Sequence, residues 1–550
     1  MKYSIQDLSS RFFVLLSAAI FSTPFLLAVY FKCGFVKLAN ENLAYRYFFH
    51  ERLSQGEGVF LGVGYLTTLL QAPLYWSTQL FARIFELNIF QQLNLFAFSS
   101  LALFNSLMIG LAIFACLSKV LTNTDRIAVA VLIFASVLGS RYVGFDYYLQ
   151  AEYYLCNMLL YAVHLFLFLF NFRKSPNKIS LMVLGIICGL SIANRITLLP
   201  FCLFCASPSI FNGAISFYKV LKRVFIYSSL SALAFLLAHL LVFKGKATLC
   251  SKAIKLWFNF TRNPGTPLGT IDFLGVFSFV GKYLYQEFFA QTALIMICVL
   301  TLMLSSVLSP KSILRHIRPY LILGFIIGSS YLFFVLKYPA VSSLFDASMV
   351  WLSLALGLTS ICLRQEKAGY VAMVFVCLCG LFISYLKIDK HGLCANSLMQ
   401  SGLNEKLAIQ NFNAIRSIAG DLPCIVVFPG NEYHHEGVFE LLLKASSDFP
   451  TWQIGRGRET VLKKYFPNLS FRHAVVGYGG PSPDLPYPDK CVLVWFSSPD
   501  FQDLPDRYPI MKEAVARAVS IKTYSEYPKG GAPEFKIHAA LLNTTIPPPR

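Results

Sequence analysis

Long apolar segments separated by short polar ones dominate the chain from its start to about residue 386. Several of these segments approach the roughly 20 residues that an α-helix needs to cross the hydrocarbon of a bilayer. The pattern predicts eleven membrane-spanning helices. They cover residues 12–31, 94–117, 127–142, 154–171, 179–194, 196–214, 224–243, 287–308, 319–336, 345–363 and 369–386. The first follows Lys2 and Arg11 and lacks a small-residue cleavage site, so we expect a retained helix and not a signal peptide.

Basic residues in the short loops set the expected orientation. With a cytoplasmic N-terminus, every even-numbered helix ends at a loop with two or three lysines or arginines, as the positive-inside rule predicts. These residues are Lys119 and Arg126; Arg173, Lys174 and Lys178; Lys219, Lys222 and Arg223; Lys311, Arg315 and Arg318; Arg364 and Lys367. This regular distribution of basic loops requires a turn at Asn194-Arg195. A single helix over residues 179–214 would place Lys219, Lys222 and Arg223 outside the cytoplasm.

Three large regions then lie outside the cytoplasm, and they cover residues 32–93, 244–286 and 387–550. In the first, the semi-apolar stretch 65–85 contains Pro73, Trp76 and Arg83, and we expect it to lie along the membrane interface.

The C-terminal region 387–550 has the pattern of a small α/β domain, which follows a transmembrane module of residues 1–386. Residues 424–428 and 491–496 are β-branched and apolar, and helical patterns follow at 438–444 and 511–519. The alternation predicts a parallel or mixed sheet. The expected fold is therefore a polytopic α-helical membrane protein with an extracytoplasmic α/β domain.

Composition agrees with this class. Hydrophobic residues make up 56% of the chain and charged residues only 14%, so there is too little polar surface to cover a soluble globule. The net charge of +19 does not indicate a nucleic-acid partner, because the basic residues lie between apolar segments, where they anchor loops to anionic lipid. Most of the fourteen cysteines lie inside apolar segments and act as small hydrophobes.

The first outer region contains a polar cluster soon after the first predicted helix. Glu41 is followed by Asn42, Tyr45 and Arg46. A carboxylate at the outer membrane face is placed to accept the proton of an attacking hydroxyl, so Glu41 is the candidate general base and the other three are candidate substrate ligands. A solvated loop with interfacial Tyr and Arg anchors explains the same residues without any chemistry.

Two further acids belong to the outer hairpin between the third and fourth predicted helices. Asp146 lies within the hairpin and Glu152 opens the fourth helix. Glu152 is a second candidate catalytic carboxylate, and Asp146 is a candidate substrate ligand. For Glu152, stabilisation of a helix N-terminus by a negative charge is the alternative.

Arg195 stands next to Asn194 between two apolar runs, where packing does not explain a charge. Its guanidinium forms two parallel hydrogen bonds, a geometry that suits a phosphate or a carboxylate. We expect Arg195 to bind a lipid phosphate or to pair with an acid of the site. An arginine that snorkels to the membrane surface without a ligand is the alternative.

The second outer region is basic. Trp257 and Arg262 lie there with several lysines, and they are candidate ligands of an anionic lipid head group or an acidic acceptor glycan. General attraction to a lipid surface explains the same residues.

The order of these features resembles the GT-C superfamily of polyprenyl-phosphate-sugar glycosyltransferases, in particular the bacterial terminal arabinofuranosyltransferase-like group. The matching segments are Glu41-Asn42-Leu43-Ala44-Tyr45, Tyr47-Phe48-Phe49, Gly56-Glu57-Gly58, Ala151-Glu152-Tyr153-Tyr154 and Asn194-Arg195-Ile196-Thr197. They fall within residues 10–240. Asn42 stands where the family has a second acid, and the arginine of its Phe-Arg-Tyr motif is absent from the register.

The resemblance implies an inverting enzyme that moves a monosaccharide from a polyprenyl-phosphate donor to a glycan, lipid or protein acceptor at the outer leaflet of a bacterial cytoplasmic membrane. Glu41 would be the base, Glu152 a positioning carboxylate and Arg195 the counter-charge of the donor phosphate. With Asn42 in the second position no obligatory metal is expected, although a divalent ion stays possible.

Two other classes remain open. A transporter would also be polytopic. It would carry charges at mid-membrane on broken helices and would show paired internal repeats. The sequence shows no such repeat. A glycan polymerase or ligase would give the first-loop carboxylate no role. A non-catalytic relative that supports envelope assembly is the third possibility, since the second acid is missing.

Overall fold

The computed structural model describes the helical part of the chain and parts of the C-terminal domain. The described residues are 4–30, 46–47, 49–50, 64–87, 89–138, 152–174, 178–211, 216–262, 274–275, 277–278, 280–281, 289–308, 311–337, 341–363, 370–376, 378–379, 410, 413–415, 417–420, 422, 424–428, 473–477, 487, 490–497, 504–526 and 535–543.

The chain divides into two compact units. The first comprises Met1–Leu27, Leu61–Ser77 and Phe98–Leu393, and the second comprises Ala28–Phe60, Thr78–Ala97 and Cys394–Arg550. The first unit holds most of the helices, and the second holds the C-terminal sheet.

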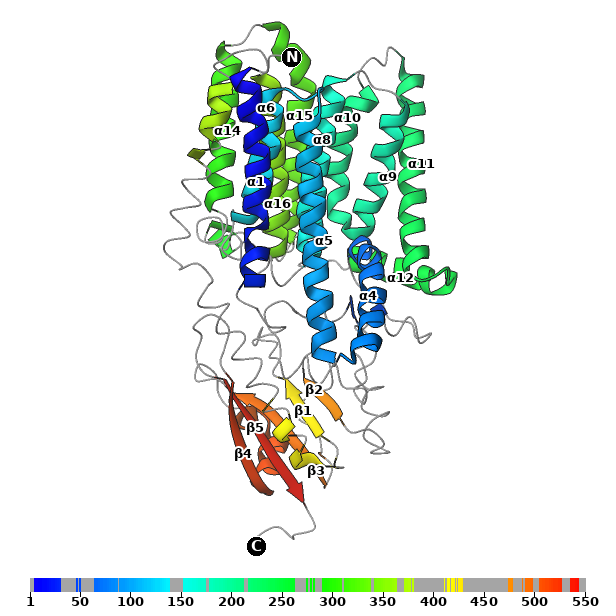
Figure 1. The fold of residues 1–550 in the computed structure, drawn as a ribbon, viewed down its shortest axis with the longest axis vertical. Helices are drawn as coiled ribbons and strands as arrows, with labels where there is room; N and C mark the ends of the chain where they lie inside the picture. Colours follow the sequence, from blue (N-terminus) through cyan, green and yellow to red (C-terminus); the bar gives the residue numbers. More distant parts are fainter. Residues whose placement is uncertain are drawn as a thin grey trace. The chain divides into compact units, whose positions relative to one another are not determined.

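The helices are α1 Ile5–Tyr30, α4 Tyr65–Phe85, α5 Ile89–Leu117, α6 Asn123–Leu138, α8 Glu152–Arg173, α9 Lys178–Asn194, η2 Ile196–Leu198, α10 Leu199–Phe211, α11 Phe217–Val242, α12 Ala247–Arg262, α14 Phe289–Leu308, α15 Lys311–Lys337 and α16 Val341–Cys362. Ten of the predicted apolar segments correspond to helices, α4 and α12 lie in the predicted outer regions, and the eleventh segment, 369–386, is described only in part (Figure 1). In the described part of the chain, five helices are long and apolar enough to cross a membrane, and they lie in α1, α5, α8, α11 and α16. Eleven spans therefore stay a prediction.

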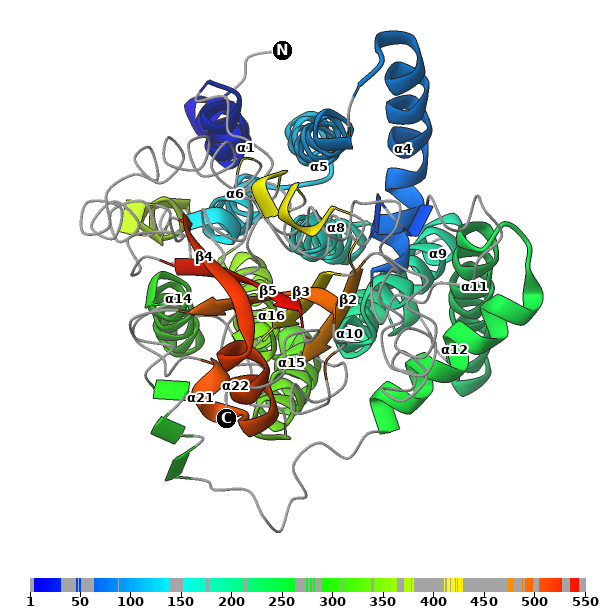
Figure 2. The same cartoon turned by 90° about the horizontal axis from the view of Figure 1, so that it is seen from below.

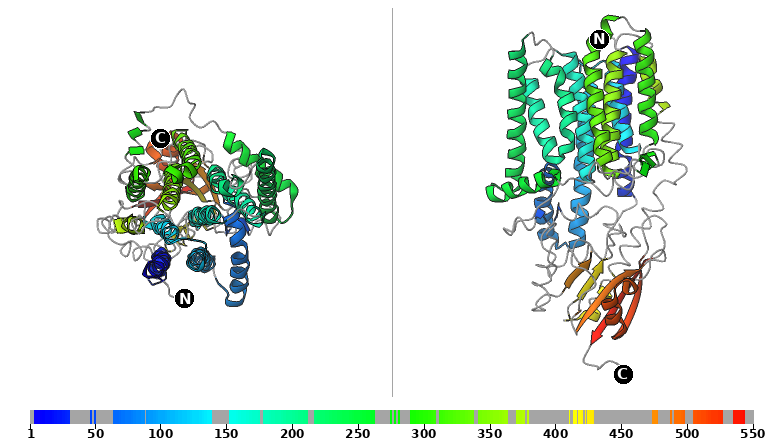
Figure 3. Two further views of the ribbon diagram at one scale, coloured as in Figure 1. Left: turned by 90° about the horizontal axis from the view of Figure 1, so that it is seen from above. Right: turned by 180° about the vertical axis from the view of Figure 1, so that it is seen from behind.

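Most helices of the first unit run side by side, and α16 lies among them (Figures 2 and 3). It packs against α6, α8, α14 and α15, and it is buried along almost all of its length. Its buried residues include the polar side chains of Asp346, Ser348 and Ser360, which lipid could not satisfy, so α16 forms the centre of the packing.

Glycine brings α9 and α11 unusually close together. A Cβ atom on Gly189 would lie 2.2 Å from the backbone oxygen of Ser231, and one on Gly185 would lie 2.9 Å from that of Tyr227. The Ser231 hydroxyl donates to the Gly185 carbonyl across the contact at 3.0 Å. Small residues spaced by four positions permit this approach in membrane helices.

A cluster of ion pairs joins one set of helix ends; we call it the Asp125 cluster. It comprises Asp7, Arg11, Asn123, Asp125, Arg126, Arg173 and Ser360. These residues come from the starts of α1 and α6 and the ends of α8 and α16. They are helix ends that the charge pattern assigns to one side of the membrane.

Asp125 is the centre of this cluster. Arg173 binds its two carboxylate oxygens through Nε and Nη2, both at 2.9 Å, and the Ser360 hydroxyl donates to Oδ1 at 2.6 Å. Arg126 pairs with Asp7. The side chains of Arg126 and Arg173 are only 4% and 3% exposed. The expectation that they anchor loops to lipid is therefore wrong for these two, because acids inside the protein neutralise them.

The C-terminal domain contains a mixed five-stranded sheet, as predicted for its class. Its strands are β1 Cys424–Phe428, β2 His473–Gly477, β3 Lys490–Ser497, β4 Ala518–Glu526 and β5 Phe535–Asn543. Their order is β2-β1-β3-β5-β4, with β1 parallel to β2 and β3, and β5 antiparallel to β3 and β4.

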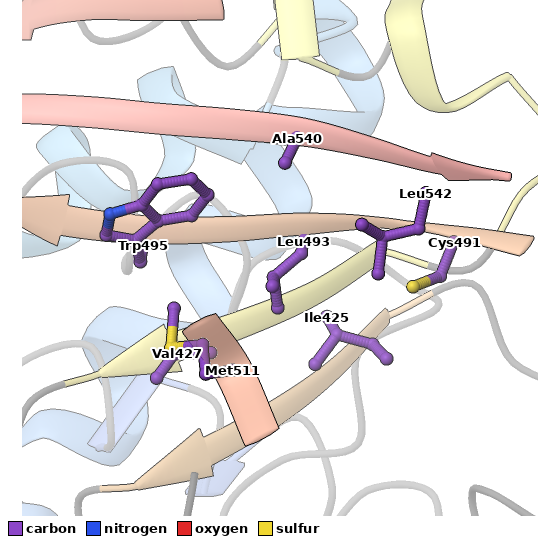
Figure 4. Close-up of a cluster of buried hydrophobic side chains, with 8 residues drawn as sticks. All are labelled: Ile425, Val427, Cys491, Leu493, Trp495, Met511, Ala540 and Leu542. Atoms are coloured by element: carbon purple, nitrogen blue, oxygen red, sulfur yellow. The ribbon is translucent and has the colours of Figure 1, made fainter. Parts of the chain in front are cut away.

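One face of this sheet packs on helix α22 (Pro509–Ala516) through a core that includes Leu493, Trp495 and Met511 (Figure 4). The predicted helix 511–519 is wrong at its end, because α22 stops at Ala516 and β4 begins at Ala518. The alternating β-branched residues Val519, Ile521 and Thr523 favour the strand. The predicted helix at 438–444 lies outside the described residues.

We expect Gly189→Ala to destabilise the protein, because the added methyl group meets backbone and not a movable side chain. The loss should be about 1–3 kcal/mol, seen as a lower midpoint of thermal unfolding in detergent. Gly110→Ala is the matched control in a helix, since nothing lies within 4 Å of its Cβ position. Equal midpoints for the two variants would contradict the close contact.

Asp125→Asn should cost about 3 kcal/mol of stability, because it leaves the buried Arg173 without its counter-ion. Glu513→Gln removes an acid from an exposed ion pair with Arg517 and should change stability by less than about 0.5 kcal/mol. Thermal unfolding of both variants tests the difference, and an unchanged midpoint for Asp125→Asn would refute a stabilising role for the cluster.

Candidate functional site

The predicted interruption at Asn194-Arg195 is present. Helix α9 ends at Asn194, Arg195 is extended with φ −155° and ψ 121°, and a short 3₁₀ turn, η2, leads into α10. Two helices therefore meet at a break, where the Asn194 carbonyl bonds outside its own helix.

Asn194 holds the break in place from several directions. Its Oδ1 accepts from the backbone N–H and the hydroxyl of Thr67 at 3.0 and 2.9 Å. Its Nδ2 donates to Oδ1 of Asn157 in α8 at 2.8 Å, and its carbonyl accepts from the N–H of Gly64 at 2.8 Å. The start of α4, the end of α9 and the first part of α8 are thereby joined.

Arg195 forms an ion pair with Asp346 of α16. Its Nη2 lies 2.7 Å from Oδ2 of Asp346, and the two side chains are 12% and 3% exposed. The Tyr161 hydroxyl of α8 donates to Oδ1 of Asp346 at 3.1 Å, and the Thr197 hydroxyl donates to Oδ2 at 3.2 Å. The carboxylate thus receives two hydroxyl hydrogen bonds and one cation, which offsets the cost of burying its charge.

The break and the ion pair form one network, which we call the Arg195 cluster. Its members are Thr67, Asn157, Tyr161, Asn194, Arg195, Thr197, Tyr331 and Asp346. Tyr331 of α15 joins it by donating to the Thr197 carbonyl. The cluster collects side chains from α4, α8, α9, α15 and α16 around a cationic group, which is an arrangement that can bind an anion.

The Arg195 cluster and the Asp125 cluster lie at opposite ends of the same helices. In α8, Tyr161 contacts Asp346 while Arg173 contacts Asp125. In α16, Asp346 belongs to one cluster and Ser360 to the other. The Arg195 cluster therefore lies toward the helix ends that the charge pattern assigns to the outer side.

Glu152 is the first residue of α8, as predicted. Asn157 of the Arg195 cluster follows five positions later, which corresponds to about 7.5 Å along the helix axis. The structure thus brings the backbone of Glu152 and the Arg195 cluster to the same end of the first unit. The side chain of Glu152 is not among the described groups.

The other predicted site residues have different outcomes. Glu41, Asn42, Tyr45 and Asp146 lie outside the described residues. Arg46 is buried in the second unit, with 2% of its surface exposed. Its neighbour Tyr47 donates to Oε1 of Gln92 at 2.5 Å and accepts from Nε2 of Gln79 at 2.7 Å.

Trp257 and Arg262 belong to α12, which runs across the direction of α11 (Figures 1 and 2). Their side chains are outside the described groups. Earlier in the helix, Lys252 and Lys255 are exposed whereas Cys250 and Ala253 are buried, a division typical of a helix at a membrane surface. Burial raises the pKa of the Cys250 thiol.

Asp346 is the functional candidate that the sequence analysis missed. It lies at the second position of the predicted helix 345–363, in an otherwise apolar stretch. Burying an acid at membrane depth costs free energy, so such an acid has a function or a charged partner. The position of Asp346 inside a predicted helix was therefore visible in the sequence. Its partner was not predictable from the pattern, because Arg195 is distant in sequence.

Metal coordination has no candidate among the described side chains, which contain no group of three or more His, Cys, Asp or Glu residues in suitable geometry. Comparison of the chain with protein-family models and with curated proteins finds no match.

Proposed function

We propose that this chain is an integral-membrane glycosyltransferase that moves a monosaccharide from a polyprenyl-phosphate donor to a glycan, lipid or protein acceptor. In this proposal Glu41 accepts the proton of the acceptor hydroxyl, Glu152 positions a substrate, and Arg195 faces the donor phosphate. Asn42, Tyr45, Arg46, Asp146, Trp257 and Arg262 are further proposed substrate ligands. No obligatory metal is part of the proposal.

One observation carries it: a buried arginine is held at a helix break, at the same end of the bundle where α8 begins with Glu152. Negative charge accumulates on the phosphate oxygens as a sugar leaves polyprenyl phosphate. A cation fixed in a low-dielectric surrounding stabilises that charge more strongly than water does, and it needs no rearrangement during the reaction.

The depth of the cluster favours this function over a transporter. Transporters built on broken helices bind substrate near the middle of the membrane. Asn157 and Asp346 each lie five positions after the first residue of their helices, Glu152 and Val341, and Tyr161 lies nine positions after Glu152. These offsets are about 7.5 and 13.5 Å along the helix axis, so the cluster belongs to the outer half of both helices, which suits a phosphate that enters from the lipid head groups.

The proposed location is a bacterial cytoplasmic membrane, with a cytoplasmic N-terminus and an extracytoplasmic C-terminal domain. Alkaline phosphatase fused after residue 550 should be active, because this enzyme works only after export. A green fluorescent protein at the same position should be dark, because it fluoresces only when it stays in the cytoplasm. Phosphatase fused after Lys119, between α5 and α6, should be inactive. The reverse pattern would overturn the orientation.

Transfer can be tested without knowing the acceptor, by measuring polyprenyl phosphate released from a panel of polyprenyl-phosphate monosaccharides in membranes that contain the protein. Glu41→Gln should lower the release at least about 100-fold, since a general base contributes on that scale. Glu152→Gln should lower it as well, and both variants should keep wild-type expression and unfolding midpoints.

Glu513→Gln is the control for this assay, because Glu513 lies in an exposed ion pair of the C-terminal domain. Full activity of Glu41→Gln would remove Glu41 as the base. Absence of release from every donor in the wild-type membranes would reject the transferase and favour a non-catalytic envelope protein.

A further inference from the structure

We propose that Asp346 is an internal counter-ion that occupies Arg195 until the phosphate of a lipid-linked donor replaces it. This inference rests on the proposed function and deepens it, because it names the phosphate as the group recognised and Asp346 as the residue that regulates access to Arg195. Asp346 is thus a positioning residue and not a catalytic one.

The first argument is the chemical likeness of the two anions. A carboxylate and a phosphate both present oxygens that a guanidinium binds at hydrogen-bond distance. In the structure Oδ2 of Asp346 lies 2.7 Å from Nη2 of Arg195. Asp346 therefore fills the position where a phosphate oxygen would bind.

Asp346 keeps hydrogen-bond partners when Arg195 turns to another anion. The hydroxyls of Tyr161 and Thr197 donate to its two oxygens at 3.1 and 3.2 Å, and neither bond involves Arg195. A buried carboxylate that loses its cation takes up a proton and becomes neutral, so phosphate binding at Arg195 is coupled to protonation of Asp346. The neutral acid does not repel the phosphate, which becomes the anion at the arginine.

The third argument comes from comparison with the other buried pair of the bundle. Arg173 binds Asp125 through two nitrogen atoms, and its side chain is 3% exposed. Arg195 is 12% exposed and lies in extended backbone between α9 and a short 3₁₀ turn. The Arg173 pair lies at helix ends and is almost fully buried, whereas the Arg195 pair lies at a helix break and its arginine is more exposed.

The exchange predicts a change in phosphate affinity that a purely structural ion pair would not give. In full-length protein reconstituted in nanodiscs, Asp346→Asn should bind farnesyl phosphate about tenfold more tightly than wild type, because the ligand no longer displaces a competing carboxylate. Arg195→Gln should lose at least about tenfold in affinity. Farnesol, which has no phosphate, should bind at least about tenfold more weakly than farnesyl phosphate to wild type.

Asp125→Asn is the matched control, since it makes the same substitution in the Arg173 pair at the other end of α8. It should lower the unfolding midpoint and leave farnesyl phosphate affinity unchanged. If Asp346→Asn does not fold, Asp346→Ser replaces it; this variant also removes the competing carboxylate and should tighten binding about tenfold. Inorganic phosphate as a competitor separates recognition of the phosphate alone from recognition of phosphate and isoprenoid together.

Unchanged or weaker binding by Asp346→Asn, or by Asp346→Ser where it stands in, would overturn the inference, and so would equal affinity for farnesol and farnesyl phosphate. These outcomes are independent of the transfer assay. If the affinities are as predicted but no donor releases its sugar, the glycosyltransferase is rejected, and a lipid-phosphate site at which Asp346 competes for Arg195 remains. Sugar release with the opposite affinities would keep the enzyme and reject Asp346 as the counter-ion.

Discussion

The described bundle depends on the pairing of buried arginines with aspartates. A charge in a low-dielectric interior is tolerated only where an opposite charge and hydrogen bonds replace its water. Arg126 and Arg173 meet this requirement with Asp7 and Asp125. Arg195 meets it with Asp346, so the position of α16 relative to the break after α9 is tied to a single ionic contact.

The Asp125 cluster and the Arg195 cluster join the same helices at different levels. Helices α8 and α16 reach both, since α8 carries Tyr161 and Arg173 and α16 carries Asp346 and Ser360. The Asp125 cluster fixes these helices at one end, and the close glycine contact between α9 and α11 fixes the helix that ends at Asn194. These contacts add to the hydrogen bonds of Asn194, which hold the break itself. The exchange of partners proposed for Arg195 requires none of them to move.

Local pattern predicted most of the helices and the break between α9 and α10, because apolar runs and a polar Asn-Arg pair are visible over short windows. It also predicted β1 and β3, which are short apolar runs that contain β-branched residues. The ion pairs escaped prediction because they join distant positions: Arg126 and Asp7 are 119 residues apart, and Asp125 and Arg173 are 48 apart. The same reason hid Asp346, whose partner is set by helix packing and not by neighbours in sequence. The helix after β3 was extended too far because its last predicted residues pair with β5, a contact that sequence alone does not reveal.

The proposed lipid-phosphate site lies at Arg195, at the end of the bundle where α8 begins. Photo-crosslinking tests it in the full chain in membranes, with a polyprenyl phosphate that carries a diazirine beside the phosphate, followed by peptide mapping. Labels should concentrate near Glu152, near Arg195 to Leu199 and around Asp346, and excess farnesyl phosphate should remove them. Labels around Asp125, or an even spread that matches a diazirine-bearing polyprenol without phosphate, would contradict the proposed site.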